Sequence, residues 1–270
     1  MSSENPYAPP ESHVADVNQM EVADLVLAAS PKSNSAGAAW AWVKSGFSFF
    51  KASPLFWILN IIIMFVLMIA LSLIPILGTI ATSILNPVFM GGLMIGTYAI
   101  HQGQKMTVGH LFAGFKSHAG SLIAVGALYL LGIIILLLIT GIIAYLTGGF
   151  DGFSTLMAAQ TGQAPDPAQI LAAYGSLKIA GFFYILMLIP LAFTMIFAPA
   201  LVVFHDMKPL AAMKLSFMGC VKNILPLLVW FILFIIFFIL GAIPLGLGLL
   251  VVIPMLIAST FAAYKMIFTD

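Results

Sequence analysis

The stretch 54-PLFWILNIIIMFVLMIALSLIPILGTIATSILNPVFMGGLMIGTYAI-100 runs for 47 residues without a charged side chain or a histidine. One membrane-spanning helix needs about 20 apolar residues, with an upper range near 25. The run is therefore too long for one span and fits two, joined by a tight turn near Pro75 to Gly78. It predicts a helical hairpin in a membrane.

Three further runs of this kind follow along the chain. They are Ala119 to Phe150 (32 residues), Ile179 to Phe204 (26 residues) and Asn223 to Tyr264 (42 residues). The first two fit one span each, and the third fits two with a turn near Gly241 to Leu245. The sequence thus predicts an all-α, polytopic membrane protein, a compact bundle of six transmembrane helices at about 54–75, 78–100, 121–147, 179–204, 224–242 and 245–267.

The overall composition excludes a water-soluble domain. Charged residues make up 7% of the 270 residues and hydrophobic residues 62%, whereas a soluble domain carries about 25% charge. The net charge of +1 gives no reason to expect a nucleic acid partner. Cys220 is the only cysteine, which excludes an intramolecular disulfide and a thiolate metal cluster.

Charge distribution predicts how the chain divides and how it is oriented. Residues 1–36 are polar and contain the segment Asn5 to Pro10, NPYAPP, which predicts a disordered cytoplasmic tail before a transmembrane domain at 37–270. With six spans, nine of the ten lysines fall on one side and Lys178 alone on the other. Lysine-rich connections favour the cytoplasm, so we expect both termini inside and the connection 148–178 outside, with a short helix at 167–175.

The six spans also form three similar units. Each odd-numbered span follows a short segment whose large apolar residues recur every three or four positions, as on one face of a helix. Each segment has a phenylalanine six residues before a predicted helix-capping residue. The three stripes are Trp40, Val43, Phe47 and Phe50; Val108, Leu111, Phe112 and Phe115; and Leu210, Met213, Phe217 and Val221. The three capping residues are Ser53, Ser121 and Asn223.

The even-numbered spans carry prolines, which can break a helix and free backbone carbonyls. These are Pro87, Pro190, Pro199 and Pro254. Asn86 and Pro87 could offer an amide and carbonyls to a ligand, although a membrane amide often just bonds a neighbouring helix. Gly92 and Gly96 form a GxxxG that allows close helix contact. We expect these four residues to form a broken-helix or packing site.

No catalytic motif is visible, and no Asp, Glu, Lys or His lies well inside a predicted span. Ion-coupled transporters usually need such groups at depth. We therefore expect no catalytic residues, no metal and no cofactor. The remaining candidates lie at the cytoplasmic ends of the spans, where lysines attract anionic lipid at about 1 kcal/mol each. The candidate headgroup contacts are Lys116, His205, Asp206, Lys208, Lys214 and Lys222. The alternative explanation needs no lipid binding: His205 and Asp206 are polar residues at an interfacial helix end, and the lysines set the orientation of the chain.

Two stretches carry a resemblance to known proteins. These are 197-FAPALVVFHD-206, with 211-AAMKLS-216 and Asn223 after it, and 86-NPVFMGGLMI-95, with 109-GHLFAGF-115 after it. They resemble an uncharacterised proteobacterial family of six-span inner-membrane proteins, over about 38–268 without the outer connection. The plan is more distantly similar to the membrane domain of some glycerophosphodiester phosphodiesterases, whose hydrolase motif is absent here. The resemblance implies a bacterial inner-membrane location and carries no activity.

Several functions fit these features. The leading hypothesis is a non-enzymatic inner-membrane protein that engages lipid or supports envelope homeostasis. A channel or uniporter for a small neutral solute is the alternative, based on the prolines at depth. A scaffold that docks a protein partner through the N-terminal tail is a third, and an enzyme acting on headgroups through His205 and Asp206 is the weakest.

Overall fold

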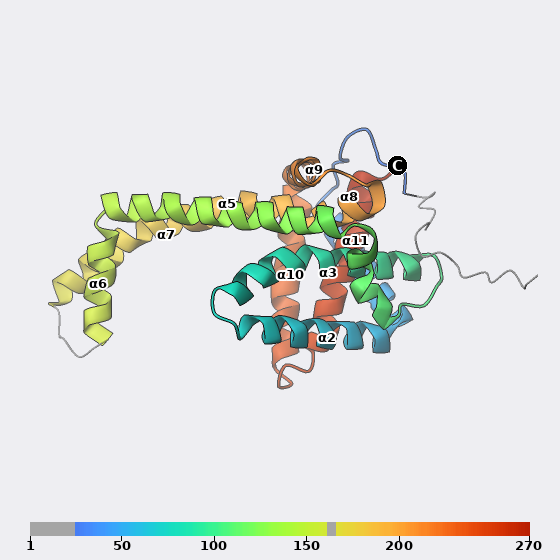
Figure 1. The fold of residues 1–270 in the computed structure, drawn as a ribbon, viewed down its shortest axis with the longest axis horizontal. Coiled ribbons are helices and arrows are strands. Elements are labelled where there is room, and N and C mark those ends of the chain that lie inside the picture. The colour runs from blue at the N-terminus through green and yellow to red at the C-terminus, as the bar shows by residue number, and fades with distance from the viewer. Residues whose placement is uncertain (1–24, 161–165) are drawn as a thin grey trace, which may run out of the picture.

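The structure is a computed structural model that describes residues 25–160 and 166–270 (Figure 1). The regular secondary structure of the described part is helical apart from one isolated antiparallel bridge, Leu27 to Thr269. The elements in chain order are α1 (Ala38–Ala52), α2 (Pro54–Ser72), α3 (Leu77–His101), the 3-10 helix η1 (Val108–Phe112), α4 (Ala113–Ser117), α5 (Ala119–Leu146), α6 (Gly149–Gln160), α7 (Pro167–Ile196), α8 (Ala198–His205), α9 (Pro209–Lys222), α10 (Ile224–Ala242) and α11 (Leu249–Phe268).

The prediction of six spans is confirmed. Within the described residues, six helices are long and apolar enough to cross a membrane. The fold is therefore that of an all-α polytopic membrane protein. The fifth span matches its predicted bounds, while the last begins four residues late because the turn runs to Gly248, with positive φ at Leu245 and Gly246. The six candidate spans are 54–72, 77–101, 119–146, 167–205, 224–242 and 249–268.

The short helix predicted at 167–175 is continuous with the fourth span, which therefore begins earlier than predicted. Residues 167–178 are the first turns of α7, which runs for 30 residues, or about 45 Å. Asp166 caps this helix, since its Oδ1 accepts a hydrogen bond from the Ala168 N–H at 3.0 Å, and Pro167 occupies the first helical position. The prediction began the span at the end of the charge-free run, but one lysine at position 178 does not interrupt a helix.

The hairpins do not form a compact parallel bundle. Figure 1 shows α5 and α7 lying side by side and projecting well beyond the rest, with α6 folded back at their far end. The hairpin of α10 and α11 crosses the direction of α2 and α3 steeply in the same view. The core therefore lies where the inner halves of the spans meet, and the outer half of the α5–α7 hairpin contributes little to it.

The three predicted units are present as α1–α2–α3, η1–α4–α5–α7 and α9–α10–α11. One residue separates each short segment from its span: Ser53, His118 and Asn223, with φ between −121° and −152°. The prediction of Ser121 as a cap is wrong because α5 begins at Ala119. The predicted capping bonds of Ser53 and Asn223 are absent as well, since neither side chain bonds the first turn of its helix.

The large apolar stripes are buried only in part. In α1, Val43 and Phe50 are buried, but Trp40 is 58% and Phe47 42% exposed. In α9 the buried face consists of Ala212, Met213, Ser216, Gly219 and Cys220. In a membrane large side chains can face lipid, and small ones let helices approach closely.

Residues 25–34, here called the strap, cross the ends of α9 and α11. The backbone of the strap bonds the end of α11 through Ala28 N–H to Phe268 O (2.8 Å) and Lys32 N–H to Ile267 O (2.7 Å). Leu25 is buried. The prediction of a disordered tail is therefore wrong for 25–36, and its remainder, 1–24, lies outside the described residues.

The proline-bearing helices are interrupted at only one place. Pro87, Pro190 and Pro254 lie inside continuous helices, so α3 is not broken at Asn86 and Pro87 as the broken-helix prediction supposed. The break falls at Phe197, two residues before Pro199. There the Ser216 Oγ accepts from the Phe197 N–H (3.0 Å) and donates to the Phe193 carbonyl (2.7 Å). A hydroxyl of α9 thus takes the place of one helical hydrogen bond.

Candidate functional site

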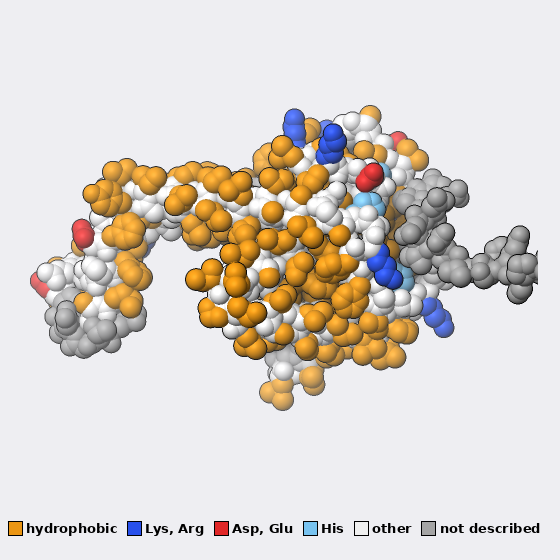
Figure 2. All heavy atoms as spheres, viewed as in Figure 1, with side chains coloured by type: hydrophobic (Ala, Val, Ile, Leu, Met, Phe, Trp, Pro, Cys, Tyr) orange, Lys and Arg blue, Asp and Glu red, His pale blue; other side chains and the backbone are white. Residues whose placement is uncertain are grey.

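The candidate lysines lie together at one end of the molecule. In Figure 2 the visible lysine side chains lie along the top and the right side of the view, and acidic side chains appear both among them and at the far tip of the α5–α7 hairpin. Lys208, Lys214 and Lys222 are exposed along α9 and its N-cap. Leu210 and Val221 on the same helix are 70% and 49% exposed. An apolar surface edged by ammonium groups suits the boundary between headgroups and acyl chains.

The lysines at this end differ in whether they form hydrogen bonds within the protein. The Lys222 Nζ donates to the Pro31 carbonyl of the strap at 3.1 Å, so part of its hydrogen-bonding capacity is used inside the protein. Lys208 and Lys214 make no such contact with the described residues. Lys116 is exposed at the end of α4. The lysines available to headgroups are therefore chiefly those of α9 and α4.

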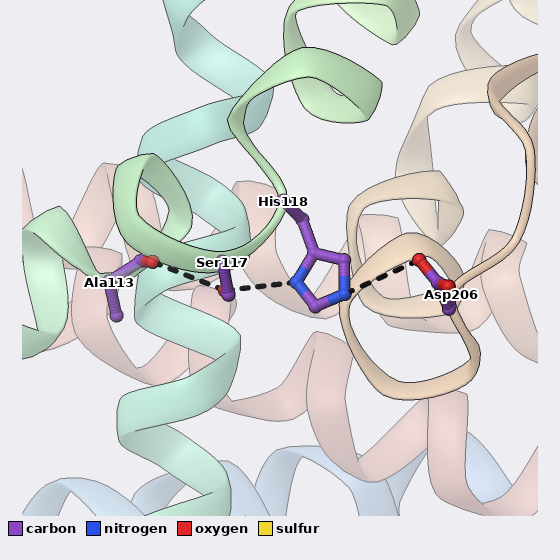
Figure 3. A network of polar contacts seen from close by, with 4 residues as sticks. All are labelled: Ala113, Ser117, His118 and Asp206. Carbon is purple, nitrogen blue, oxygen red and sulfur yellow. Dashed lines mark hydrogen bonds and ion pairs between the residues drawn. The ribbon is translucent and has the colours of Figure 1, made fainter. Parts of the chain in front are cut away.

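His205 and Asp206 are adjacent in sequence but have different partners. The His205 Nε2 lies 2.6 Å from the Tyr264 hydroxyl of α11. The Asp206 carboxylate is 3.7 Å from the His118 Nε2, and the Nδ1 of that histidine is 2.9 Å from the Ser117 Oγ (Figure 3). Asp206 has a left-handed backbone, with φ 48°. The two residues thus join helices and do not form an acid–base pair with each other.

The same end holds a further polar contact that the sequence did not indicate. The Lys265 Nζ of α11 lies 2.6 Å from the His101 Nε2 at the end of α3. Beneath it, buried aromatic rings from three helices meet, with centroids 5.5 to 6.3 Å apart: Tyr98, Phe204 and Phe261. Aromatic pairs at such distances add to simple burial. Among the described residues, no group of three or more His, Cys, Asp or Glu could hold a metal ion.

Two titratable side chains outside the spans are shifted by burial. Burial raises the pKa of the Cys220 thiol to about 12, against a smaller opposite effect of its hydrogen bond with Ser216. Burial also lowers the pKa of His110, whose Nδ1 accepts a hydrogen bond from the Thr107 N–H at 2.9 Å. Both groups are therefore neutral near pH 7, and neither provides a reactive charge.

The predicted site at Asn86, Pro87, Gly92 and Gly96 separates into two faces of α3. A Cβ on Gly92 would lie 2.5 Å from the His110 carbonyl, and one on Gly96 would lie 2.6 Å from the Met106 side chain. These glycines therefore serve close packing against η1 and the residues before it. Pro87 is buried, whereas Asn86 is exposed and faces a cavity.

This cavity, here called the central cavity, has a volume of about 350 Å³ and lies between α3, α5, α7, α8, α10 and α11. Apart from Asn86, its polar lining comes from Tyr129 and Thr260. Its wall is otherwise apolar and includes three methionines. Asn86, Met90 and Met94 follow one another at intervals of four along one face of α3. This spacing is visible in the sequence, but it indicates a cavity only when the positions of the facing helices are known. The methionines and the aromatic residues of α10 that line it are Met90, Met94, Met195, Trp230 and Phe231.

Comparisons with known proteins support the membrane assignment and go no further. A probable inner membrane protein of Burkholderia thailandensis is 26% identical over 195 residues, which cover 70% of this chain and 69% of that protein. No protein-family model and no solved structure matches the chain. The similarity to the membrane domain of glycerophosphodiester phosphodiesterases finds no support among these matches. The chain is an all-α, multi-pass membrane protein that is similar to an inner membrane protein.

Proposed function

We propose that this protein resides in the bacterial inner membrane and binds anionic lipid, without catalysis, at its lysine-bearing end. The observation that carries the proposal is the exposed surface of α9, where Lys208 and Lys214 border Leu210 and Val221. The similarity to an inner membrane protein supports the location. Lysine bias supports an orientation with both termini in the cytoplasm.

The strength expected of this contact follows from the number of free lysines. Each lysine near an anionic surface contributes about 1 kcal/mol, and Lys222 contributes less because it also bonds Pro31. Two free lysines and one partly engaged lysine amount to about 2–3 kcal/mol, or a preference of about 30- to 150-fold for anionic over neutral lipid.

Native mass spectrometry of the gently purified protein tests the proposal. We expect stoichiometric anionic lipid on the wild type, and its loss when Lys208, Lys214 and Lys222 are replaced by Gln. Lys178→Gln is the control, since Lys178 is exposed on α7, near the opposite end. A bulk-like lipid mixture on the wild type, or equal retention by the triple variant, would contradict the proposal.

The alternatives lead to separate measurements. A channel for a small neutral solute requires uptake into proteoliposomes above that of empty vesicles. The absence of uptake across a broad panel of neutral solutes would exclude the channel.

A scaffold function depends on the tail segment Asn5 to Pro10, which lies outside the described residues. It is contradicted if deletion of 1–24, which leaves the strap intact, retains every pulldown partner. A headgroup enzyme is disfavoured by the separate partners of His205 and Asp206.

A further inference from the structure

We infer that the central cavity is a binding site for one uncharged amphiphile that carries a carbonyl group and enters from the lipid phase. The chemistry fits the ester carbonyl of an acyl lipid or the ring carbonyl of a quinone. This site is distinct from the lysine-bearing end and does not depend on lipid binding there.

The polar part of the argument begins at Asn86. It lies nine residues into α3, about 14 Å along the helix axis from Leu77, which is near the middle of a hydrocarbon core about 30 Å thick. Its side chain is exposed to the cavity and makes no hydrogen bond to any described residue. An amide without a partner at this depth is costly, because lipid tails offer none.

A second polar residue lines the same space. Tyr129 of α5 lines the cavity, and its hydroxyl likewise makes no hydrogen bond within the part of the chain that the structure describes. The third polar residue, Thr260, is satisfied within its own helix through the Leu256 carbonyl at 3.0 Å. Two donors, the Asn86 amide and the Tyr129 hydroxyl, are therefore available to an acceptor such as a carbonyl oxygen.

The rest of the wall selects an apolar and uncharged molecule. No Asp, Glu, Lys or His lines the cavity, so a charged ligand would find no counter-ion there. Met90, Met94 and Met195 present flexible thioethers, which adapt to ligands of varied shape. Trp230 adds an aromatic face. The pattern of an apolar pocket with a few placed polar groups is typical of small-molecule sites.

Size and access set further limits on the ligand. The volume of about 350 Å³ holds on the order of a dozen non-hydrogen atoms, if each takes about the 30 Å³ of a water molecule. This suffices for a quinone ring or for the carbonyl end of one acyl chain. Asn86 and Phe231 line the cavity and are also exposed, so the cavity is open to the outside of the bundle and a longer tail can remain in the bilayer.

Two probes distinguish the two sources of a carbonyl. Duroquinone is a ring without a tail, and methyl decanoate is an ester with an acyl chain. Equilibrium dialysis of the full-length protein in mild detergent, with protein-free micelles as the reference, measures how much of each probe is bound. We expect saturable binding of at least one probe with a stoichiometry near one, and the same chemical class in solvent extracts of the purified protein.

Three variants connect that binding to the cavity. Ala192→Phe fills the cavity from α7 and is expected to abolish binding, whereas Ala127→Phe makes the same change at an exposed position of α5 and should leave binding unchanged. Asn86→Leu keeps the bulk but removes the amide and is expected to weaken binding about tenfold. Failure of both probes to bind the wild type, wild-type binding by Ala192→Phe, or wild-type binding by Asn86→Leu would each overturn the inference.

Discussion

The break between α7 and α8 depends on one hydroxyl, and Ser216→Ala tests this. Ser216 is fully buried in α9 and supplies both the acceptor for the Phe197 N–H and the donor for the Phe193 carbonyl. Removing it leaves the N–H without a partner. The carbonyl keeps only the Cys220 thiol at 3.5 Å, which is a weak donor. We therefore expect the contact between α9 and the break to be destabilised.

The magnitude follows from these partners. A buried donor left unsatisfied costs about 1–3 kcal/mol. The carbonyl adds less because the thiol remains, and relaxation of the helix ends recovers part of the loss. We expect a total near 2 kcal/mol, which corresponds to an increase of about 30-fold in the opening equilibrium of this region.

Cys220 provides the assay, because it is the only cysteine of the chain and lies one turn from Ser216. The thiol is buried, and burial raises its pKa to about 12, so at pH 8 a maleimide reacts with the native protein only after local opening. We expect Ser216→Ala to accelerate alkylation about 30-fold in mild detergent. The unfolded proteins should react at equal rates.

Ser83→Ala is the matched control. The hydroxyl of Ser83 donates only to its own helix, at Thr79 O (2.8 Å), so alkylation of Cys220 should change less than twofold. Equal alkylation rates for Ser216→Ala and the wild type would refute the reasoning that this hydroxyl completes the interrupted helix.

Three further predictions concern other parts of the fold. Gly46→Ala places a Cβ 2.6 Å from the Met255 carbonyl and should cost about 1–3 kcal/mol of stability, measured by detergent unfolding, whereas Gly141→Ala meets nothing within 4 Å and should be neutral or slightly stabilising. Asn223→Ala removes bonds to the strap at the Lys32 carbonyl and at Asn34, so trypsin should cut after Lys32 several-fold faster; an unchanged rate would show that other contacts hold the strap. The pKa of His110 is lowered by burial, so its contribution to stability is complete above about pH 6.5 and decreases as the pH falls below that value. His110→Asn keeps a hydrogen-bond acceptor but does not titrate. Scanning fluorimetry should therefore show a smaller loss of Tm between pH 7.5 and 5.5 in this variant than in the wild type.

Sequence patterns predicted the spans because length and charge alone decide whether a helix can enter a membrane. Nine of the twelve predicted span ends agree with the structure within two residues, and most of them lie beside lysine, histidine or proline, or at a turn that holds proline. The error at α7 has a local signal, since Asp166 and Pro167 form a helix start. The prediction missed this signal because it took Lys178 as the limit of the span and began the helix after it.

The interior of the bundle could be identified only from the tertiary structure. Hydrophobic periodicity cannot distinguish a core face from a lipid face, because both are apolar in a membrane. It therefore placed Trp40 on one stripe with the buried Val43 and Phe50, and it gave no weight to the small buried residues of α9. The partners of His205, Asp206 and Ser216 lie on other helices, far away in sequence.

The sequence by itself thus determined the class of protein, the number of spans and the three-unit plan, since these follow from runs of neighbouring residues and the size of the bilayer. Only the tertiary structure decided that Asn86 faces a cavity while Gly92 packs against η1. Both residues lie on one helix, and the difference between a packed face and an open one is set by which other helices come close.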